Sequence, residues 1–151
     1  MHTLKIIVGS AMGGTEQVAN YVAENLQGHF ADNTEVLTSA NAKDLTEDPD
    51  AFLLFMTANT GSGDLPDNIL PLYTELKTTF PNIVHRKYAL VNFGDSSYPT
   101  FGQAGHTLTE ALQGVGANEI VEPLLIDGSA ERYPQLTVLE WVKGVLEKLD
   151  A

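Results

Sequence analysis

The sequence contains no cysteine. Disulfide bonds, iron–sulfur clusters, thiolate zinc sites and thiol nucleophiles are therefore excluded, because each of them requires a cysteine sulfur. The histidines offer no substitute, since their spacing fits no metal-ligand motif and surface positions are expected for them: His2, His29, His85 and His106. No metal site and no catalytic side chain is predicted, so any redox chemistry must come from a bound cofactor.

Basic residues are also scarce. Eight lysines and arginines stand against 20 aspartates and glutamates, which gives a formal net charge of −12. A surface of this sign repels nucleic-acid phosphates and anionic lipids, so neither a nucleic acid nor a membrane is expected as a partner. Such a surface accelerates encounters with a basic protein instead. The alternative, which composition alone leaves open, is that the acidity only maintains solubility.

Long apolar runs and a targeting segment are missing as well. No run approaches the roughly 20 residues of a membrane-spanning helix. Residues 1–10, MHTLKIIVGS, indicate a first strand rather than a signal peptide, and a cytoplasmic protein is therefore expected. The 151 residues, of which 43% are hydrophobic, suit one compact domain over residues 1–151.

What the sequence does contain is a regular alternation of apolar runs with segments of helical period. Strands are predicted at Leu4–Gly9, Glu35–Thr38, Ala51–Thr57, Tyr88–Gly94 and Ile120–Asp127. Helices are predicted at Gly14–Leu26, Asp67–Thr79, Phe101–Val115 and Leu136–Leu149, while Asn41–Asp50 is either a loop or a short helix. The near-continuous apolar strands indicate a parallel sheet with helices on both faces, and ligands of such folds lie beyond the carboxyl ends of the strands.

The first loop at those ends is GSAMGGT, residues 9–15, between a strand and a helix. Gly13 and Gly14 permit close approach of a ligand, and Ser10 and Thr15 supply hydroxyls. Backbone N–H groups at a helix N-terminus bind anions, so the loop is a candidate phosphate site. No lysine follows it and G-x-G-x-x-G is absent, which excludes two common nucleotide-binding motifs. The alternative is a tight turn in which Ser10 or Thr15 caps the helix.

The second loop, residues 57–68, reads TANTGSGDLPDN and follows the third strand. Thr57, Asn59 and Thr60 offer polar groups, while Gly61 and Gly63 leave the backbone open to close approach. The two acids that flank the proline can also serve as helix caps.

The third loop, residues 93–102, reads FGDSSYPTFG and follows the fourth strand. Tyr98 stands next to Pro99 among turn residues, where an aromatic side chain suits stacking against a planar ligand. Packing of that ring on its own loop is the alternative, and core packing is favoured for Phe101. If the strand order is 2-1-3-4-5, the three loops leave the same sheet edge and fit a phosphorylated, planar, redox-active group.

Over essentially its full length the sequence resembles the flavodoxins, in particular the short-chain bacterial members of the MioC and YqcA type. NTGSGDLPDN and GDSSYPTF are similar to two loops in the FMN domains of cytochrome P450 reductase and sulfite reductase. The resemblance implies a flavodoxin-like αβα sandwich with a five-stranded parallel sheet of order 2-1-3-4-5, noncovalent FMN and transfer of single electrons. A monomer is expected that takes electrons from a flavoprotein reductase and passes them to an acceptor redox enzyme. The net charge of −12 favours a basic reductase.

By position, the resemblance assigns the FMN phosphate to the first loop, flavin N5 to the carbonyl of Gly61 and the outer flavin face to Tyr98. Two residues depart from the family pattern, because Met12 replaces a hydroxyl residue and Thr60 replaces an aromatic one. Both departures imply weaker FMN binding. The residues expected to contact FMN are Ser10, Ala11, Met12, Gly13, Gly14, Thr15, Thr57, Ala58, Asn59, Thr60, Gly61, Gly63, Asp64, Phe93, Gly94, Asp95, Tyr98, Phe101 and Gly102.

Other functions occur on the same fold. An FMN-dependent quinone or nitro reductase would need a site for NAD(P)H, and no basic cluster suited to a second phosphate stands near the loops. A receiver domain is excluded, because the strand ends lack its acids and its lysine. A binding module without cofactor would follow only if Met12 and Thr60 abolish FMN binding.

Overall fold

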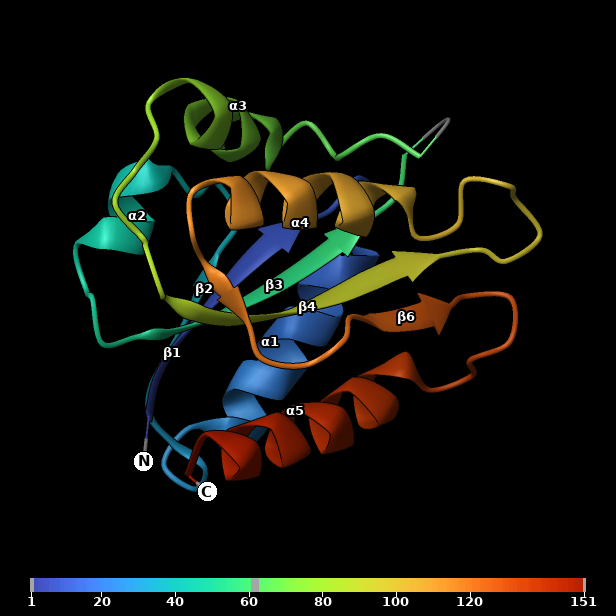
Figure 1. The fold of residues 1–151 in the computed structure, drawn as a ribbon. Coiled ribbons are helices and arrows are strands. Elements are labelled where there is room, and N and C mark those ends of the chain that lie inside the picture. The colour runs from blue at the N-terminus through green and yellow to red at the C-terminus, as the bar shows by residue number, and fades with distance from the viewer. Residues whose placement is uncertain (1, 61–62, 151) are drawn as a thin grey trace.

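The computed structural model describes residues 2–60 and 63–150 and shows a parallel sheet between two layers of helices (Figure 1). The strands are β1 (His2–Gly9), β2 (Ala31–Leu37), β3 (Phe52–Ala58), β4 (Lys87–Gly94), β5 (Asn118–Glu119) and β6 (Leu124–Asp127). They are hydrogen-bonded in the order β2-β1-β3-β4-β5, and β6 also pairs with β4. The predicted three-layer α/β fold and strand order are confirmed.

Helices cover both faces of the sheet. They are α1 (Gly14–Leu26), α2 (Ala42–Thr46), α3 (Leu70–Thr78), α4 (Gln103–Gly114) and α5 (Pro134–Asp150). One apolar cluster packs α1 and α5 against one face, and a second packs α3 and α4 against the other (Figure 1). Helix α1 has the predicted bounds, and the predicted stripe of Val18, Val22 and Leu26 is buried along it up to its last residue.

The strand predicted at Ile120–Asp127 is wrong in its first half. Tyr88 of β4 pairs with Glu119, and Val91 of β4 pairs with Leu124. The step from one pair to the next is three residues along β4 but five residues along the segment that faces it. The two extra residues leave the ladder, and Pro123 has no N–H to contribute to it. The fifth position of the sheet is therefore filled by two short strands, which makes six strands rather than five.

Three other predicted bounds are corrected for local reasons. Helix α4 begins at Gln103 rather than Phe101, because Gly102 has a φ of +83°, a left-handed conformation that no α-helix contains. Helix α5 begins at Pro134, a residue that suits the first turn. Strand β2 begins at Ala31, although its first half is polar, because an edge strand exposes alternate side chains to solvent.

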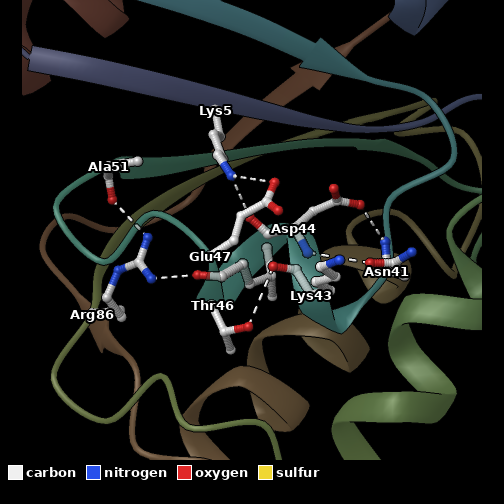
Figure 2. Close-up of polar contacts among 9 residues, drawn as sticks. Lys5, Asn41, Lys43, Asp44, Thr46, Glu47, Ala51 and Arg86 are labelled. Atoms are coloured by element: carbon white, nitrogen blue, oxygen red, sulfur yellow. Dashed lines mark hydrogen bonds and ion pairs between the residues drawn. The ribbon is translucent and has the colours of Figure 1, made fainter.

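The undecided segment Asn41–Asp50 contains the short helix α2, which Asn41 and Asp44 cap reciprocally. At its far end Lys5 of β1 reaches in from the sheet (Figure 2). The Lys5 side chain is only 3% exposed, and its Nζ donates to the Asp44 carbonyl at 2.6 Å and pairs with Glu47 at 3.4 Å. A buried ammonium group is thus supplied with partners by the last turn of α2.

Arg86, just before β4, completes this arrangement from the other side (Figure 2). Its guanidinium donates to the carbonyl of Leu45 and, at 2.8 Å, to the carbonyl of Ala51. Burial lowers the pKa of Arg86, while the nearby charges of Asp48 and Asp50 act in the opposite direction. The N-terminal end of the sheet therefore holds two cations whose donors are taken up by main-chain carbonyls.

Candidate functional site

The three unusual loops leave adjacent strands at one edge of the sheet, on the right of Figure 1. Gly9 of β1 pairs with Thr57 of β3, and Thr57 pairs with Asn92 of β4. Gly94, at the end of β4, pairs in turn with Asp127 of β6. The loops that begin after these strands are therefore neighbours, as the strand order predicts.

Close packing at the start of the first loop requires a glycine. A Cβ on Gly9 would lie 2.5 Å from Oγ1 of Thr57. Thr57 itself is fully buried, and its hydroxyl donates to the carbonyl of Ala58 at 3.1 Å. The polar side chain of Thr57 therefore packs beneath the loops and does not reach their surface.

The first loop presents main-chain donors instead of a side-chain cap. Gly13 stands at the N-cap of α1 with a φ of +86°, and among the residues that the structure describes no side chain caps the helix. The alternative in which Ser10 or Thr15 caps α1 is therefore wrong. Ser10 Oγ accepts the N–H of Gly13 at 3.0 Å, so its own hydroxyl hydrogen stays available to a ligand.

The remaining donors of this loop point to an anion. Within residues 2–60 and 63–150, no acceptor is found for the backbone N–H groups of Ala11, Met12, Gly14, Thr15 and Glu16. The Thr15 side chain is 5% exposed, and its hydroxyl has no hydrogen-bond partner in the same part of the chain. The Met12 side chain is 96% exposed, so Met12 offers the site only its backbone. This donor set fits a phosphate at a helix N-terminus.

The second loop is closed by hydrogen bonds of its own. Thr60 donates to the carbonyl of Asp64 through its N–H at 2.9 Å and through its hydroxyl at 3.1 Å. Gly63 has a φ of +95°, and a Cβ there would lie 2.7 Å from Cβ of Thr100 on the third loop. The second and third loops are therefore in contact at Gly63. The predicted contact of Gly61 with flavin N5 lies outside the described residues.

The third loop holds one aromatic ring outward and another inward. The Tyr98 side chain is 63% exposed, so its ring is not packed into its own loop. Phe101 is half-buried, and its ring lies so close to Gly94 that a Cβ there would be 2.9 Å from it. Phe93, at the end of β4, packs against the apolar cluster of α1 and α5.

Predicted residues of the second and third loops line two cavities. One of about 360 Å³ is lined by Asn59, Gly94, Asp95, Tyr98 and Thr100. The other, of about 480 Å³, lies on the side of the second loop that faces α3 and α4, and it includes Thr60, Gly63 and Asp64 in its lining. The first of these cavities, next to the Tyr98 ring, is the one that suits a planar group.

Two asparagine side chains hold these loops in place: Asn59, which the sequence predicts as a site residue, and Asn92, which it did not single out. Asn92 is buried within β4, and its side chain donates to the Thr57 carbonyl at 3.0 Å and accepts the N–H of Gly105 at 3.2 Å. Asn59 accepts the N–H of Ala104 at 2.9 Å. The start of α4 is thus tied to the ends of β3 and β4, and the signal was a lone amide in the apolar run ALVNF.

The side chain of Asn68 holds the first loop in place. Its amide nitrogen donates to the carbonyls of Val8 and Thr38, each at 2.8 Å, and its oxygen accepts the N–H of Ser10 at 2.9 Å. These bonds hold the chain before α3 against the ends of β1 and β2. Helix α3 begins at Leu70 and not, as predicted, at Asp67, and Pro71 stands in its first turn, the position that suits a proline.

Within residues 2–60 and 63–150, no three His, Asp or Glu side chains are grouped so that they could hold a metal ion. His29, His85 and His106 are exposed and His2 is half-buried. No helix within these residues is long and apolar enough to cross a bilayer.

Comparison with known proteins identifies relatives that match nearly the whole chain. Residues 6–141 match the family model described as Flavodoxin. The chain is 33% identical to Flavodoxin YqcA of Escherichia coli K12 over 95% of both sequences, and 31% identical to a MioC homologue of Haemophilus influenzae over 95% of this chain and 97% of that one. It superimposes on a mutant of flavodoxin from Pseudomonas aeruginosa with a TM-score of 0.88, at 27% identity and 99% coverage of both chains.

Proposed function

This chain belongs to the flavodoxin family, and we propose which of its residues hold the family's cofactor and which kind of partner it meets. Flavodoxins bind FMN and carry electrons between redox proteins. The chain is accordingly an FMN-binding electron carrier, not a quinone or nitro reductase with a substrate of its own. When bound, FMN supplies the redox chemistry, and the residues of this chain bind and orient it.

The first loop is the proposed phosphate site. The observation that carries this assignment is the set of N–H groups at residues 11, 12, 14, 15 and 16, which lack acceptors among the described residues next to the unpartnered Thr15 hydroxyl. A phosphate would satisfy these donors together at the N-terminus of α1, where the helix dipole also favours an anion. No lysine or arginine lies within residues 6–42, so the main chain and hydroxyls carry the recognition.

The flavin ring is proposed to bind beside Tyr98, over the 360 Å³ cavity. The exposed phenol ring offers a stacking face, and Gly94 brings the backbone close to the same space. The other expected contacts are proposed as main-chain or packing contributions: Thr57, Ala58, Asn59, Thr60, Gly61, Gly63, Asp64, Phe93, Asp95, Phe101 and Gly102. The burial of Thr57 and the hydrogen bond from Thr60 to Asp64 are the basis for limiting those two to the main chain.

The test compares FMN with riboflavin, which has the same ring but no phosphate. Thr15→Val keeps the shape of the side chain and removes its hydroxyl. Because a hydrogen bond to a charged group contributes about 1.5–3 kcal/mol, FMN affinity of the apoprotein should fall about 10-fold or more. Riboflavin affinity should stay unchanged. An equal loss for both ligands would show that Thr15 acts on the fold and not on the phosphate.

The partners of an electron carrier are other redox proteins, and we propose that the donor is a basic flavoprotein reductase. The net charge of −12 supports this choice, as does the absence of lysine and arginine from residues 44–76 and 88–131, which contain the second and third loops. Asp64 is exposed and Asp95 half-buried on those loops. We propose that an acceptor enzyme docks at the same edge of the sheet. The reason is that the electrons leave from FMN, which would be bound there.

A further inference from the structure

Adjacent strands β4 and β6 end in the same three-residue turn. In Asp95-Ser96-Ser97, Oδ1 of Asp95 accepts the N–H of Ser97 at 2.9 Å and its hydroxyl at 2.6 Å. In Asp127-Gly128-Ser129, Oδ1 of Asp127 accepts the N–H of Ser129 at 3.0 Å and its hydroxyl at 2.6 Å. Each aspartate thereby fixes the turn that follows its own strand.

Only one of these aspartates also bonds to the neighbouring turn. Asp127 accepts the N–H of Ser96 at 3.2 Å and, through its second oxygen, the hydroxyl of Ser96. A backbone bond from Gly128 to the carbonyl of Gly94, at 2.7 Å, runs alongside. The donors on Ser129 and Ser96 hold the pKa of the Asp127 carboxyl well below its usual range, so these bonds are charge-assisted at neutral pH.

The loop that carries Tyr98 is therefore anchored at two points. Ser96 is tied to Asp127, and the carbonyl of Thr100 accepts the Asn59 side-chain N–H at 3.2 Å. Tyr98 lies midway between the two anchored residues. Its ring, by contrast, is mostly exposed, so the direction in which it points depends on the loop and not on packing around the ring.

We propose that Asp127 is a positioning residue for the FMN site, which holds the Tyr98 loop in the conformation that stacks on the flavin. The inference rests on the proposed role of Tyr98 as the stacking residue. Asp127 is not in the lining of the cavity beside Tyr98, and within the described residues its side chain bonds to Ser96 and Ser129, so its effect on FMN passes through Ser96. It adds a residue from the end of β6 to a site otherwise built from the ends of β1, β3 and β4.

Whether FMN binding weakens or tightens when Asp127 is replaced distinguishes a positioning role from a purely electrostatic one. FMN carries a negatively charged phosphate, so removal of a nearby carboxylate for charge reasons alone should tighten binding. Removal of an anchor should weaken it, because the loop must then be ordered when FMN binds. Asp127→Ala breaks the link and removes the charge. Asp127→Asn removes only the charge, since its amide can still accept from Ser129 and donate to the Ser96 hydroxyl.

The experiment measures FMN and riboflavin affinity of the apoprotein for these variants. Asp127→Ala should weaken both ligands about 5- to 10-fold, and Asp127→Asn should restore affinity to within about twofold of wild type. Asp67→Ala is the matched control, because Asp67 is exposed at the same edge and none of the described residues donates to its side chain. Ser96→Ala, a milder change, should give a smaller loss and a changed visible circular dichroism of bound FMN.

Tyr98→Ala distinguishes the possible failures. In that background Asp127→Ala should cause no further loss, because the ring that it positions is gone. If Tyr98→Ala leaves affinity unchanged, the proposed stacking role of Tyr98 is wrong. If Tyr98→Ala weakens binding but Asp127→Ala tightens it, leaves it unchanged or still weakens it in the Tyr98→Ala background, the positioning role of Asp127 is overturned.

Discussion

The two ends of the parallel sheet differ in whether their hydrogen-bond donors have acceptors within the described part of the chain. At the N-terminal end, Lys5 and Arg86 donate to main-chain carbonyls in and just after α2 (Figure 2). At the C-terminal end, the first loop leaves the N–H groups of residues 11, 12 and 14–16 without an acceptor in the part of the chain described. Each end also has a cavity, of about 300 Å³ beside Arg86 and about 360 Å³ beside Tyr98.

The difference separates residues that stabilise the fold from residues that await a ligand. Ala11, Met12 and Gly14 of the first loop are exposed, so their N–H groups are open to water or to a ligand. A buried cation that is already bonded, such as Lys5 at 3% exposure, contributes to the structure instead. Variants at the two ends should therefore change different quantities: stability at the N-terminal end and FMN affinity at the C-terminal end.

The largest effect is expected from Arg86→Met. The change leaves the carbonyls of Leu45 and Ala51 without their charged donor, and each such bond contributes about 1.5–3 kcal/mol. The free energy of unfolding of the apoprotein, measured by urea denaturation, should fall by about 3 kcal/mol. FMN affinity of the folded protein should not change.

Arg132→Met is the matched control, because Arg132 is exposed and its guanidinium lies 5.9 Å from the Tyr133 ring without a bond to the main chain of the described residues. Its effect on stability should stay within about 0.5 kcal/mol. Equal losses for the two variants would contradict the role of Arg86. A tenfold loss of FMN affinity in Arg86→Met would show that the two ends are coupled.

The second-largest effect is expected on FMN affinity and not on the free energy of unfolding. Tyr98→Ala should weaken FMN binding by about 1–3 kcal/mol, the range for a ring stacked on an aromatic side chain. Stability of the apoprotein should hardly change, because the side chain is mostly exposed. Phe80→Ala is the control, since Phe80 is 70% exposed and lies in the connection before β4, at the N-terminal end of the sheet. An equal loss of affinity in both variants would argue against stacking at Tyr98.

The sequence predicts the fold because the relevant signals are local. The spacing of Val18, Val22 and Leu26 defines α1, and apolar runs define β1, β3 and β4. The break in the fifth strand was missed although Pro123 marks it, because the two extra residues are evident only in the register with β4. The alternation of strands and helices in the sequence does not reveal such a mismatch in register.

The site is predictable only in part, for a related reason. Glycines and hydroxyls mark the loops, and the structure brings those loops to one edge. The side chains that hold the loops, such as Asn68, Asn92 and Asp127, bond to segments far away in the sequence. Their residue types suit turns and caps equally well, so their partners emerge only once the strands are paired.

Not every buried polar group at the N-terminal end of the sheet has a hydrogen-bond partner. In the part of the chain described, the hydroxyls of Tyr88 and Thr109 and Oε1 of Glu119 are buried without a hydrogen-bond partner. Burial, and then the charge of Glu119, raises the pKa of Tyr88 to about 12. Burial, and then the charge of Glu122, raises the pKa of Glu119. The folded protein therefore holds the Glu119 proton more tightly than the unfolded chain does.

The pH dependence of stability follows from this sign. The contribution of Glu119 is most favourable below the unfolded pKa of about 4.3, and it declines as the pH rises towards and through the raised folded value. Glu119→Gln removes the decline, so it should raise the free energy of unfolding by about 1 kcal/mol at pH 8 and by much less at pH 4. The exposed Glu24→Gln should show no such difference between the two pH values. A Glu119→Gln variant that is less stable at pH 8 would contradict the prediction.

The smallest effect concerns the partner, and it tests which end of the sheet meets it. Lys5, Arg86 and Lys87 lie at the N-terminal end, whereas residues 44–76 and 88–131, with the second and third loops, contain no lysine or arginine. A basic reductase should therefore approach the C-terminal end. Asp64→Lys changes the charge there by two units, which opposes one positive charge 10 Å away by about 0.8 kcal/mol in water. The rate of electron transfer from such a reductase should fall about fourfold at low salt.

Asp32→Lys makes the same change of net charge on an exposed residue near the start of β2, at the other end of the sheet. Stopped-flow measurements should show a smaller loss of rate for this variant, because its charge is farther from the docking surface. The difference between the two variants should shrink as salt rises from 0.01 M to 0.1 M, since the Debye length falls from about 30 to about 10 Å. Equal rates at low salt would mean that net charge, and not its position, guides the encounter. The division of roles between the two ends would then hold for FMN but not for the partner.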